Sequence, residues 1–81
     1  MDDSCREIID KLREYAEGQN ENFHLLIKEI AISPDDRGRF SDACVKVAKK
    51  LKVFTIDLWK AVDGYLIDMG GDYRLYIGEQ E

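Results

Sequence analysis

The sequence of 81 residues has little of what builds special sites: two cysteines, one histidine, one proline and one tryptophan. Two cysteines are too few for a disulfide framework, and a single histidine with two distant cysteines fits no familiar metal-ligand spacing. No apolar run approaches the roughly 20 residues of a membrane-spanning helix. The sequence therefore predicts no disulfide scaffold, no metal site and no membrane span.

A catalytic centre is not indicated either. His24 falls in a helical pattern, which is typical of a surface or hydrogen-bonded histidine. No histidine, serine or cysteine neighbours a carboxylate at a recognisable catalytic spacing, so we expect no enzyme activity and no cofactor. The acidic start Met1-Asp2-Asp3 differs from the basic start of a secretory signal, and a cytoplasmic location is expected.

The charges are distributed unevenly along what the length predicts to be one small domain, residues 1–81. The net charge is −5, but residues 37–60 carry seven basic and two acidic side chains. Residues 1–36 carry four basic and ten acidic ones, and residues 61–81 carry one basic and five acidic ones. A basic block between acidic flanks indicates a charged partner.

Apolar residues recur at the helical period in four segments, so a mainly α fold of four helices is predicted. The segments are residues 5–17, 23–32, 39–51 and 56–69, with a short helical turn expected just before the third. Nine positions are expected to be buried: Ile8, Leu12, Leu26, Ile27, Ile30, Val47, Leu51, Leu58 and Val62. Cys5 and Cys44 fall on apolar helix faces and are interpreted as small buried hydrophobes, and Trp59 as a core residue.

Capping residues mark the expected helix ends. Gly18 is expected to end the first helix in the left-handed conformation. Helix starts are predicted at Ser4, in a capping box with Glu7, at Asn20 or Asn22, at Ser33 or Ser41, and at Thr55.

The tail, residues 72–78, alternates at the strand period, with Tyr73, Leu75 and Ile77 on one face. No second strand is evident, and a lone strand leaves its backbone groups unpaired. We expect this strand to pair with its own copy across a two-fold axis, which predicts a homodimer with those three residues at the interface. The alternative is that the tail folds back over the helices of its own chain.

A helix-turn-helix pattern occupies residues 47–60. Such a unit needs a small residue where its two helices meet, which Ala48 supplies, and apolar residues on both sides of a tight turn, which Leu51 and Val53 supply. Leu58 lies on the expected inner side of the second helix, and Thr55 at its start.

At these residues the chain resembles helix-turn-helix regulators of the phage-repressor type, including small antitoxins. Residues 65–77 resemble the closing helix, glycine pair and short strand of some of those antitoxins, so the likeness covers residues 44–77. Lys52 stands where the family favours glycine, and one helix would have to serve as both recognition and closing helix. The resemblance implies a DNA-binding regulator, with a toxin as one possible protein partner.

Duplex DNA is therefore one predicted partner. The expected contacts are Lys46, Lys49, Lys50, Lys52, Thr55 and Lys60. The start of the second helix offers Thr55, Ile56, Trp59 and Lys60 but no arginine or asparagine, so contacts to phosphates or DNA shape are favoured over base reading. The alternative is an acidic protein-interaction module, such as an immunity protein, inhibitor or adaptor, without nucleic-acid binding.

Overall fold

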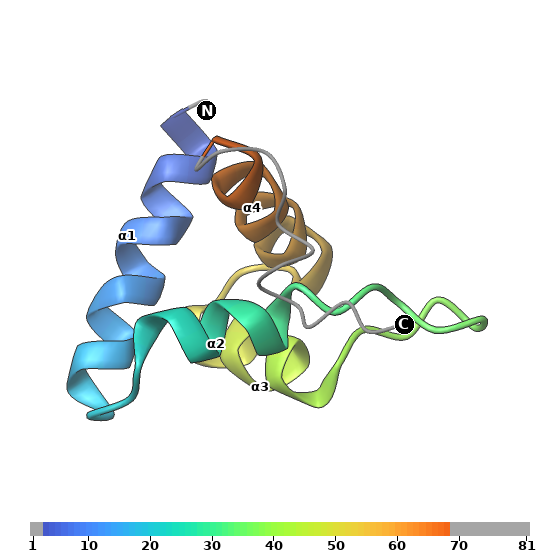
Figure 1. The fold of residues 1–81 in the computed structure, drawn as a ribbon, viewed down its shortest axis with the longest axis horizontal. Helices are drawn as coiled ribbons and strands as arrows, with labels where there is room; N and C mark the ends of the chain where they lie inside the picture. Colours follow the sequence, from blue (N-terminus) through green and yellow to red (C-terminus); the bar gives the residue numbers. More distant parts are fainter. Residues whose placement is uncertain (1–2, 69–81) are drawn as a thin grey trace.

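The computed structural model describes residues 3–68, and these form four helices joined by three loops (Figure 1). The helices are α1 (Asp3–Gly18), α2 (Phe23–Ile30), α3 (Asp42–Leu51) and α4 (Thr55–Asp68). The prediction of four helices is confirmed, and the described residues contain no strand. The strand expected over residues 72–78 lies outside them. None of the four helices has the length and apolar character needed to cross a membrane.

The first helix differs from its prediction at both ends. α1 begins at Asp3, so Ser4 lies inside the helix and is not its cap. Gly18 is the last helical residue, and Asn20 adopts the left-handed conformation with φ 58°. The Asn20 amide donates to the Glu17 carbonyl at 3.1 Å, and the Glu21 amide donates to the Ala16 carbonyl at 2.8 Å. This pair of bonds satisfies carbonyls that the helix end leaves open, and asparagine tolerates the conformation well.

Side-chain caps start the second and third helices. The Asn22 side chain accepts a hydrogen bond from the Leu25 amide at 3.1 Å. Ser41 accepts from the Cys44 amide at 3.2 Å, so α3 begins at Asp42 and the expected start at residue 39 is wrong. The Ser41 hydroxyl also donates to the Glu29 carbonyl at 2.9 Å, which ties the start of α3 to the end of α2.

The loop over residues 31–41 replaces the short helical turn expected there, and α2 ends at Ile30, not at residue 32. Asp35 Oδ1 accepts hydrogen bonds from the amides of Arg37 at 2.8 Å and Arg39 at 3.0 Å. The Arg39 side chain pairs with Asp35 Oδ2 at 2.9 Å, and Gly38 supplies the positive φ of 78°. These hydrogen bonds lower the pKa of Asp35, and the bond from the Arg39 amide has the largest effect. One carboxylate therefore holds both sides of the loop together.

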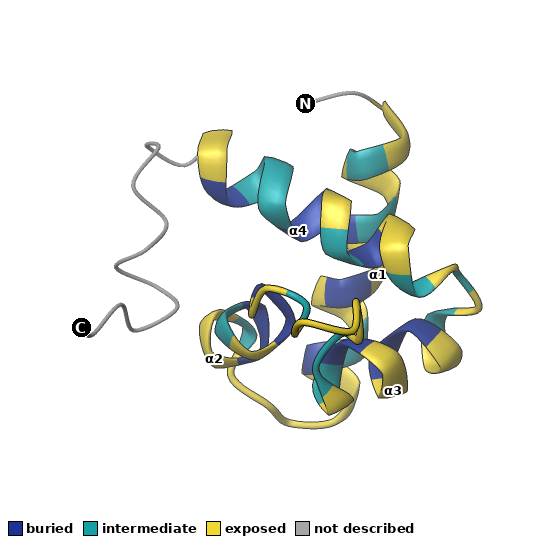
Figure 2. Cartoon of the chain, turned by 90° about the vertical axis from the view of Figure 1, so that its right-hand side faces the viewer, coloured by how far each residue is buried: buried dark blue, intermediate teal, exposed yellow. Residues whose placement is uncertain are grey.

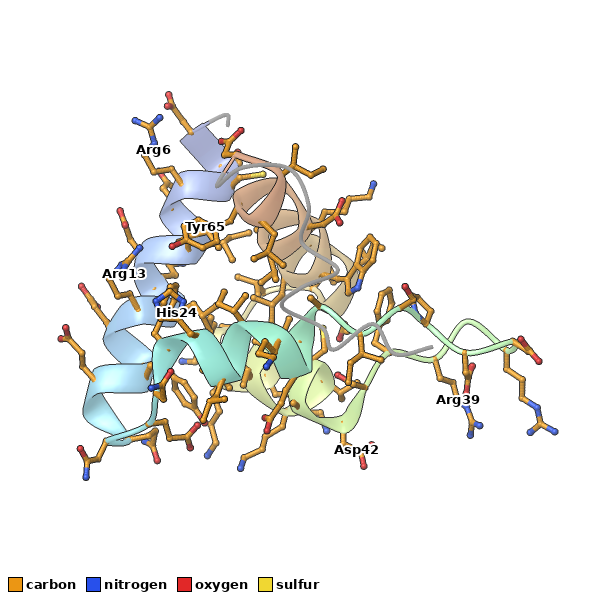
Figure 3. The ribbon with its side chains drawn as sticks, in the orientation of Figure 1. Arg6, Arg13, His24, Arg39, Asp42 and Tyr65 are labelled. Atoms are coloured by element: carbon orange, nitrogen blue, oxygen red, sulfur yellow. The ribbon has the colours of Figure 1, made fainter. Side chains whose placement is uncertain are left out.

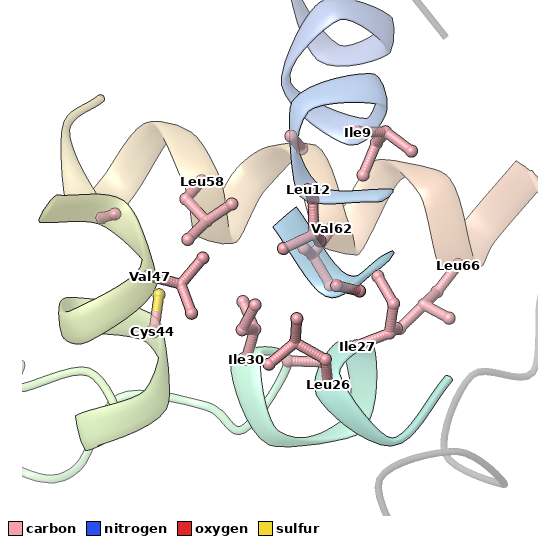
Figure 4. Packing of buried hydrophobic residues seen from close by; sticks show 14 residues of the cluster. Ile9, Leu12, Leu26, Ile27, Ile30, Cys44, Val47, Leu58, Val62 and Leu66 are labelled. Atoms are coloured by element: carbon pink, nitrogen blue, oxygen red, sulfur yellow. The ribbon is translucent and has the colours of Figure 1, made fainter. Parts of the chain in front are cut away.

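The core lies where α4 packs against the other three helices (Figures 2 and 4). Within residues 3–68 every buried side chain is apolar. The buried set is Ile9, Leu12, Ala16, Leu26, Ile27, Ile30, Ala31, Cys44, Val47, Ala48, Leu58, Ala61, Val62 and Leu66. Cys44 is fully buried, and burial raises the pKa of its thiol to about 11 because the thiolate is disfavoured there.

The expected core is confirmed at seven of its nine positions, and Ile8 and Leu51 are only half-buried. Both pack against the core from its rim, as do Cys5 and Trp59, which were expected to be buried. The rim is wide because a chain of this length encloses only a small fully buried centre.

Replacing Ile27 with alanine tests this core. Ile27 is 0% exposed, whereas Leu25 on the same helix is 57% exposed. Ile27→Ala is expected to lower the free energy of unfolding by about 2–5 kcal/mol, because it removes packed atoms and leaves a cavity. Leu25→Ala is the matched control and should change it by about 0.5 kcal/mol or less. Urea titration followed by circular dichroism measures both, and equal losses would contradict the packing described.

Candidate nucleic-acid interface

A three-residue turn, residues 52–54, joins α3 to α4. Its first residue, Lys52, is left-handed, with φ 61° and ψ 42°. The Lys52 amide donates to the Lys49 carbonyl at 3.2 Å, and the Val53 amide donates to the Ala48 carbonyl at 3.1 Å. Lys52 therefore takes the conformation that glycine adopts most easily, and two backbone hydrogen bonds hold it there.

The helices joined by this turn meet through small and apolar side chains. Ala48 is 1% exposed, and its small volume lets α4 come close to α3. Leu58 and Val62, on the inner side of α4, are completely buried. Figure 4 shows the two helices crossing steeply, so their outward sides face different directions.

Three of the predicted lysines lie together on the outward side of α3. Lys46, Lys49 and Lys50 are all exposed, and spacings of three and four residues place them on one face of the helix. Cys44, Val47 and Ala48 occupy the opposite, buried side. With Asp42 and Val45 the lysines line a shallow hollow, and Lys52 is exposed in the turn that follows.

The two predicted contacts on α4 are placed differently. Thr55 is half-buried and is the first helical residue, so its expected role as a cap is wrong. The Phe54 carbonyl accepts the first hydrogen bond of α4, which the Leu58 amide donates at 3.0 Å. Lys60 is exposed on α4, a different helix from that of the three grouped lysines. The structure thus groups three of the six predicted residues, adds Lys52 beside them and separates the other two.

Trp59 is engaged with the loop that precedes α3. Its indole Nε1 donates to the Ile32 carbonyl at 3.2 Å, and its ring lies 6.1 Å from that of Phe40. The side chain therefore anchors the loop over residues 31–41 and is not available to read a base edge. This loop extends away from the helices, and Figure 3 shows Arg39 on it.

A second aromatic group lies where α1, α2 and α4 meet, and the sequence patterns did not indicate it. The Arg13 guanidinium lies 4.4 Å from the centre of the Phe23 ring. Phe23 makes edge contacts with His24 at 5.9 Å and Tyr65 at 5.8 Å. His24 is exposed, as expected for a surface histidine. Cation–π and edge contacts stabilise the junctions between helices, so we interpret this group as part of the packing of the three helices.

Residues 3–68 contain no cluster of three or more histidine, cysteine or acidic side chains that could hold a metal ion. The predicted dimer contacts Tyr73, Leu75 and Ile77 lie outside the described residues. No protein-family model, curated protein or solved structure matches the chain.

Glycine substitutions at Lys52 and at Lys50 are expected to change the free energy of unfolding in opposite directions. Lys52→Gly is expected to raise the free energy of unfolding by about 1 kcal/mol, because glycine removes the cost of a left-handed residue with a Cβ atom. Lys50→Gly, two residues earlier in regular α-helix, should lower it by about 1 kcal/mol. Thermal and urea unfolding measure both changes. A loss of stability in Lys52→Gly would contradict the turn geometry.

Proposed function

We propose that the chain is a small DNA-binding domain of the helix-turn-helix type that holds duplex DNA through its phosphates. The observation that carries the proposal is the row of exposed lysines on α3, Lys46, Lys49 and Lys50, beside the turn lysine Lys52. In helix-turn-helix proteins the first helix of the pair crosses the DNA backbone, and α3 is that helix here. Lysine ammonium groups bind phosphates and release counterions from the duplex.

The exposed side of α4 argues for phosphate binding in place of base reading. Its exposed residues include Ile56, Asp57 and Ile67, and Lys60 is its one exposed cation. Base edges are read best by arginine, asparagine and glutamine, none of which α4 contains. Asp57 would also lie close to phosphates if α4 entered a groove, and like charges repel. The α3 face is therefore the side proposed to meet the duplex.

The uneven distribution of charge favours one orientation on DNA. The exposed residues of α1 include five acidic and three basic side chains, whereas those of α3 include three lysines and Asp42. A molecule whose charge is unevenly distributed is turned by the field of the duplex so that its more basic part approaches. A protein of net charge −5 can bind DNA in this way, with an affinity that falls steeply as salt screens the lysines.

A protein-interaction module is the second candidate, and one observation favours it. Ile56 and Ile67 of α4 are 42% and 52% exposed and lie three helical turns apart on the same side. Exposed apolar side chains that align on one helix are typical of a contact surface. A toxin, as the antitoxin-like resemblance implies, is one partner class for such a surface.

Binding to a duplex at several salt concentrations tests the proposed function. With a labelled duplex of about 20 base pairs and anisotropy detection, log K is expected to fall linearly with log salt. Lys49→Gln should reduce the slope by about 0.9, and the combined Lys46, Lys49 and Lys50 to Gln variant by about three times as much.

Lys11→Gln is the matched control, because Lys11 is an exposed lysine on α1 and not on the proposed face of α3. It should leave the slope unchanged. Absence of binding at low salt, or equal affinity of the triple variant and the unaltered chain, would contradict the proposal and favour the interaction module.

A further inference from the structure

The fourth helix is apolar on two opposite sides, unlike the first. Its inner side buries Leu58, Ala61, Val62 and Leu66, yet Ile56 and Ile67 are exposed on its outer side. Every exposed residue of α1 is charged, serine or glycine. A helix with apolar residues on both sides is typically covered on both sides. The remaining exposed apolar residues, Leu25, Ile32, Val45 and Phe54, lie on other segments.

Four residues form a narrow seam along the outer side of α4: Ile56, Lys60, Asp63 and Ile67. Their spacings of four, three and four residues are those of the contact positions in a coiled coil. Within residues 3–68 neither Lys60 nor Asp63 makes an ion pair or a hydrogen bond through its side chain. Gly64 borders the seam, and, apart from the nearby backbone of α4, no atom of residues 3–68 lies within 4 Å of the position its Cβ would occupy.

We propose that the α4 seam pairs with the same seam of a second copy, antiparallel, about a two-fold axis level with the peptide bond between residues 61 and 62. In that register Ile56 meets the partner's Ile67, and Lys60 meets the partner's Asp63. The two-fold axis repeats both contacts, because identical patches come together in such an interface. The two contacts between isoleucines then lie at the ends of the interface, and the two lysine–aspartate contacts lie between them.

The order of charges on the seam selects this arrangement. A parallel pair would place Lys60 against the partner's Lys60 and Asp63 against the partner's Asp63, and like charges in contact oppose association. The antiparallel register places opposite charges together at both positions. The seam carries both the lysine and the aspartate of the pair, so a second copy of the chain provides a partner for each charge.

The pairing goes beyond the proposed function and does not depend on it. The seam lies on α4, whereas the lysines proposed to bind DNA lie on the outward side of α3, which crosses α4 steeply. Both faces are therefore accessible at once in a dimer. The contact is also separate from Tyr73, Leu75 and Ile77, through which a different dimer was predicted.

Charge reversal in the full chain, without DNA, tests the pairing. α4 is about 21 Å long, so the contact is small and a dissociation constant in the micromolar range is expected. Sedimentation equilibrium from about 10 μM to 1 mM covers this range. Lys60→Asp and Asp63→Lys should each weaken self-association by roughly tenfold or more, because each replaces both attractive pairs with repulsive ones.

The register predicts two rescues. The chain carrying both substitutions should associate again, because opposite charges meet once more. An equimolar mixture of the Lys60→Asp chain and the Asp63→Lys chain should form a heterodimer more strongly than either chain dimerises alone. Heterodimer formation in the mixture also shows that the single variants are folded. Lys11→Asp on α1 is the matched control and should leave association unchanged.

Three results would overturn the proposal. One is a chain that stays monomeric up to about 1 mM, well above the range expected for a small interface. The other is a dimer that neither reversal weakens, which would place the contact elsewhere, with the predicted tail strand as the next candidate. A dimer weakened by both reversals but restored by neither rescue would also overturn it, since the antiparallel register requires the rescue.

Discussion

Burial of the inner side of α4 is the constraint on which the rest of the structure depends. Leu58, Ala61, Val62 and Leu66 come from one helix and close the core that α1, α2 and α3 leave open. Once this side is buried, the outward side of α4 is determined, because side chains on a helix are fixed relative to one another. Cys44, Val47 and Ala48 face the same core, so the lysines of α3 face solvent.

The approach of α3 to α4 rests on a strained residue in the turn. Lys52 is left-handed at a cost that glycine would avoid, but its amide and that of Val53 satisfy carbonyls at the end of α3. Asn20 ends α1 in the same manner. Both turns are compact, so a chain with a small core keeps its helices close, and the turn lysine is held beside the basic face of α3.

Helical periodicity was sufficient to predict four helices and most of the core, because burial of one side of each helix imposes that period on the sequence. Helix ends were predicted less well. Gly18, Ser4 and Thr55 are all common end residues, yet the ends were decided by backbone hydrogen bonds, such as those of Asn20, and by the contact of Ser41 with Glu29. The contact of Ser41 with Glu29 joins two different segments, so it depends on the folded arrangement and not on local composition.

The candidate site was predictable only within single helices. The spacing of Lys46, Lys49 and Lys50 placed them on one side of α3, but Lys60 lies on α4, and the steep crossing of the two helices is contained in no local pattern. The outer seam of α4 was not predicted, because the helical period of that segment was used only to place its buried side. The spacing of Ile56 and Ile67 was the available signal.

The proposed DNA-binding face on α3 is tested most directly by following the amide chemical shifts of the isotope-labelled full chain as duplex DNA is added at low salt. If the outward side of α3 binds DNA and the outer seam of α4 does not, the largest shifts are expected at residues 45–52. Ile56 and Ile67 should move little. The largest shifts at the start of α4, or no shifts anywhere in α3, would contradict it.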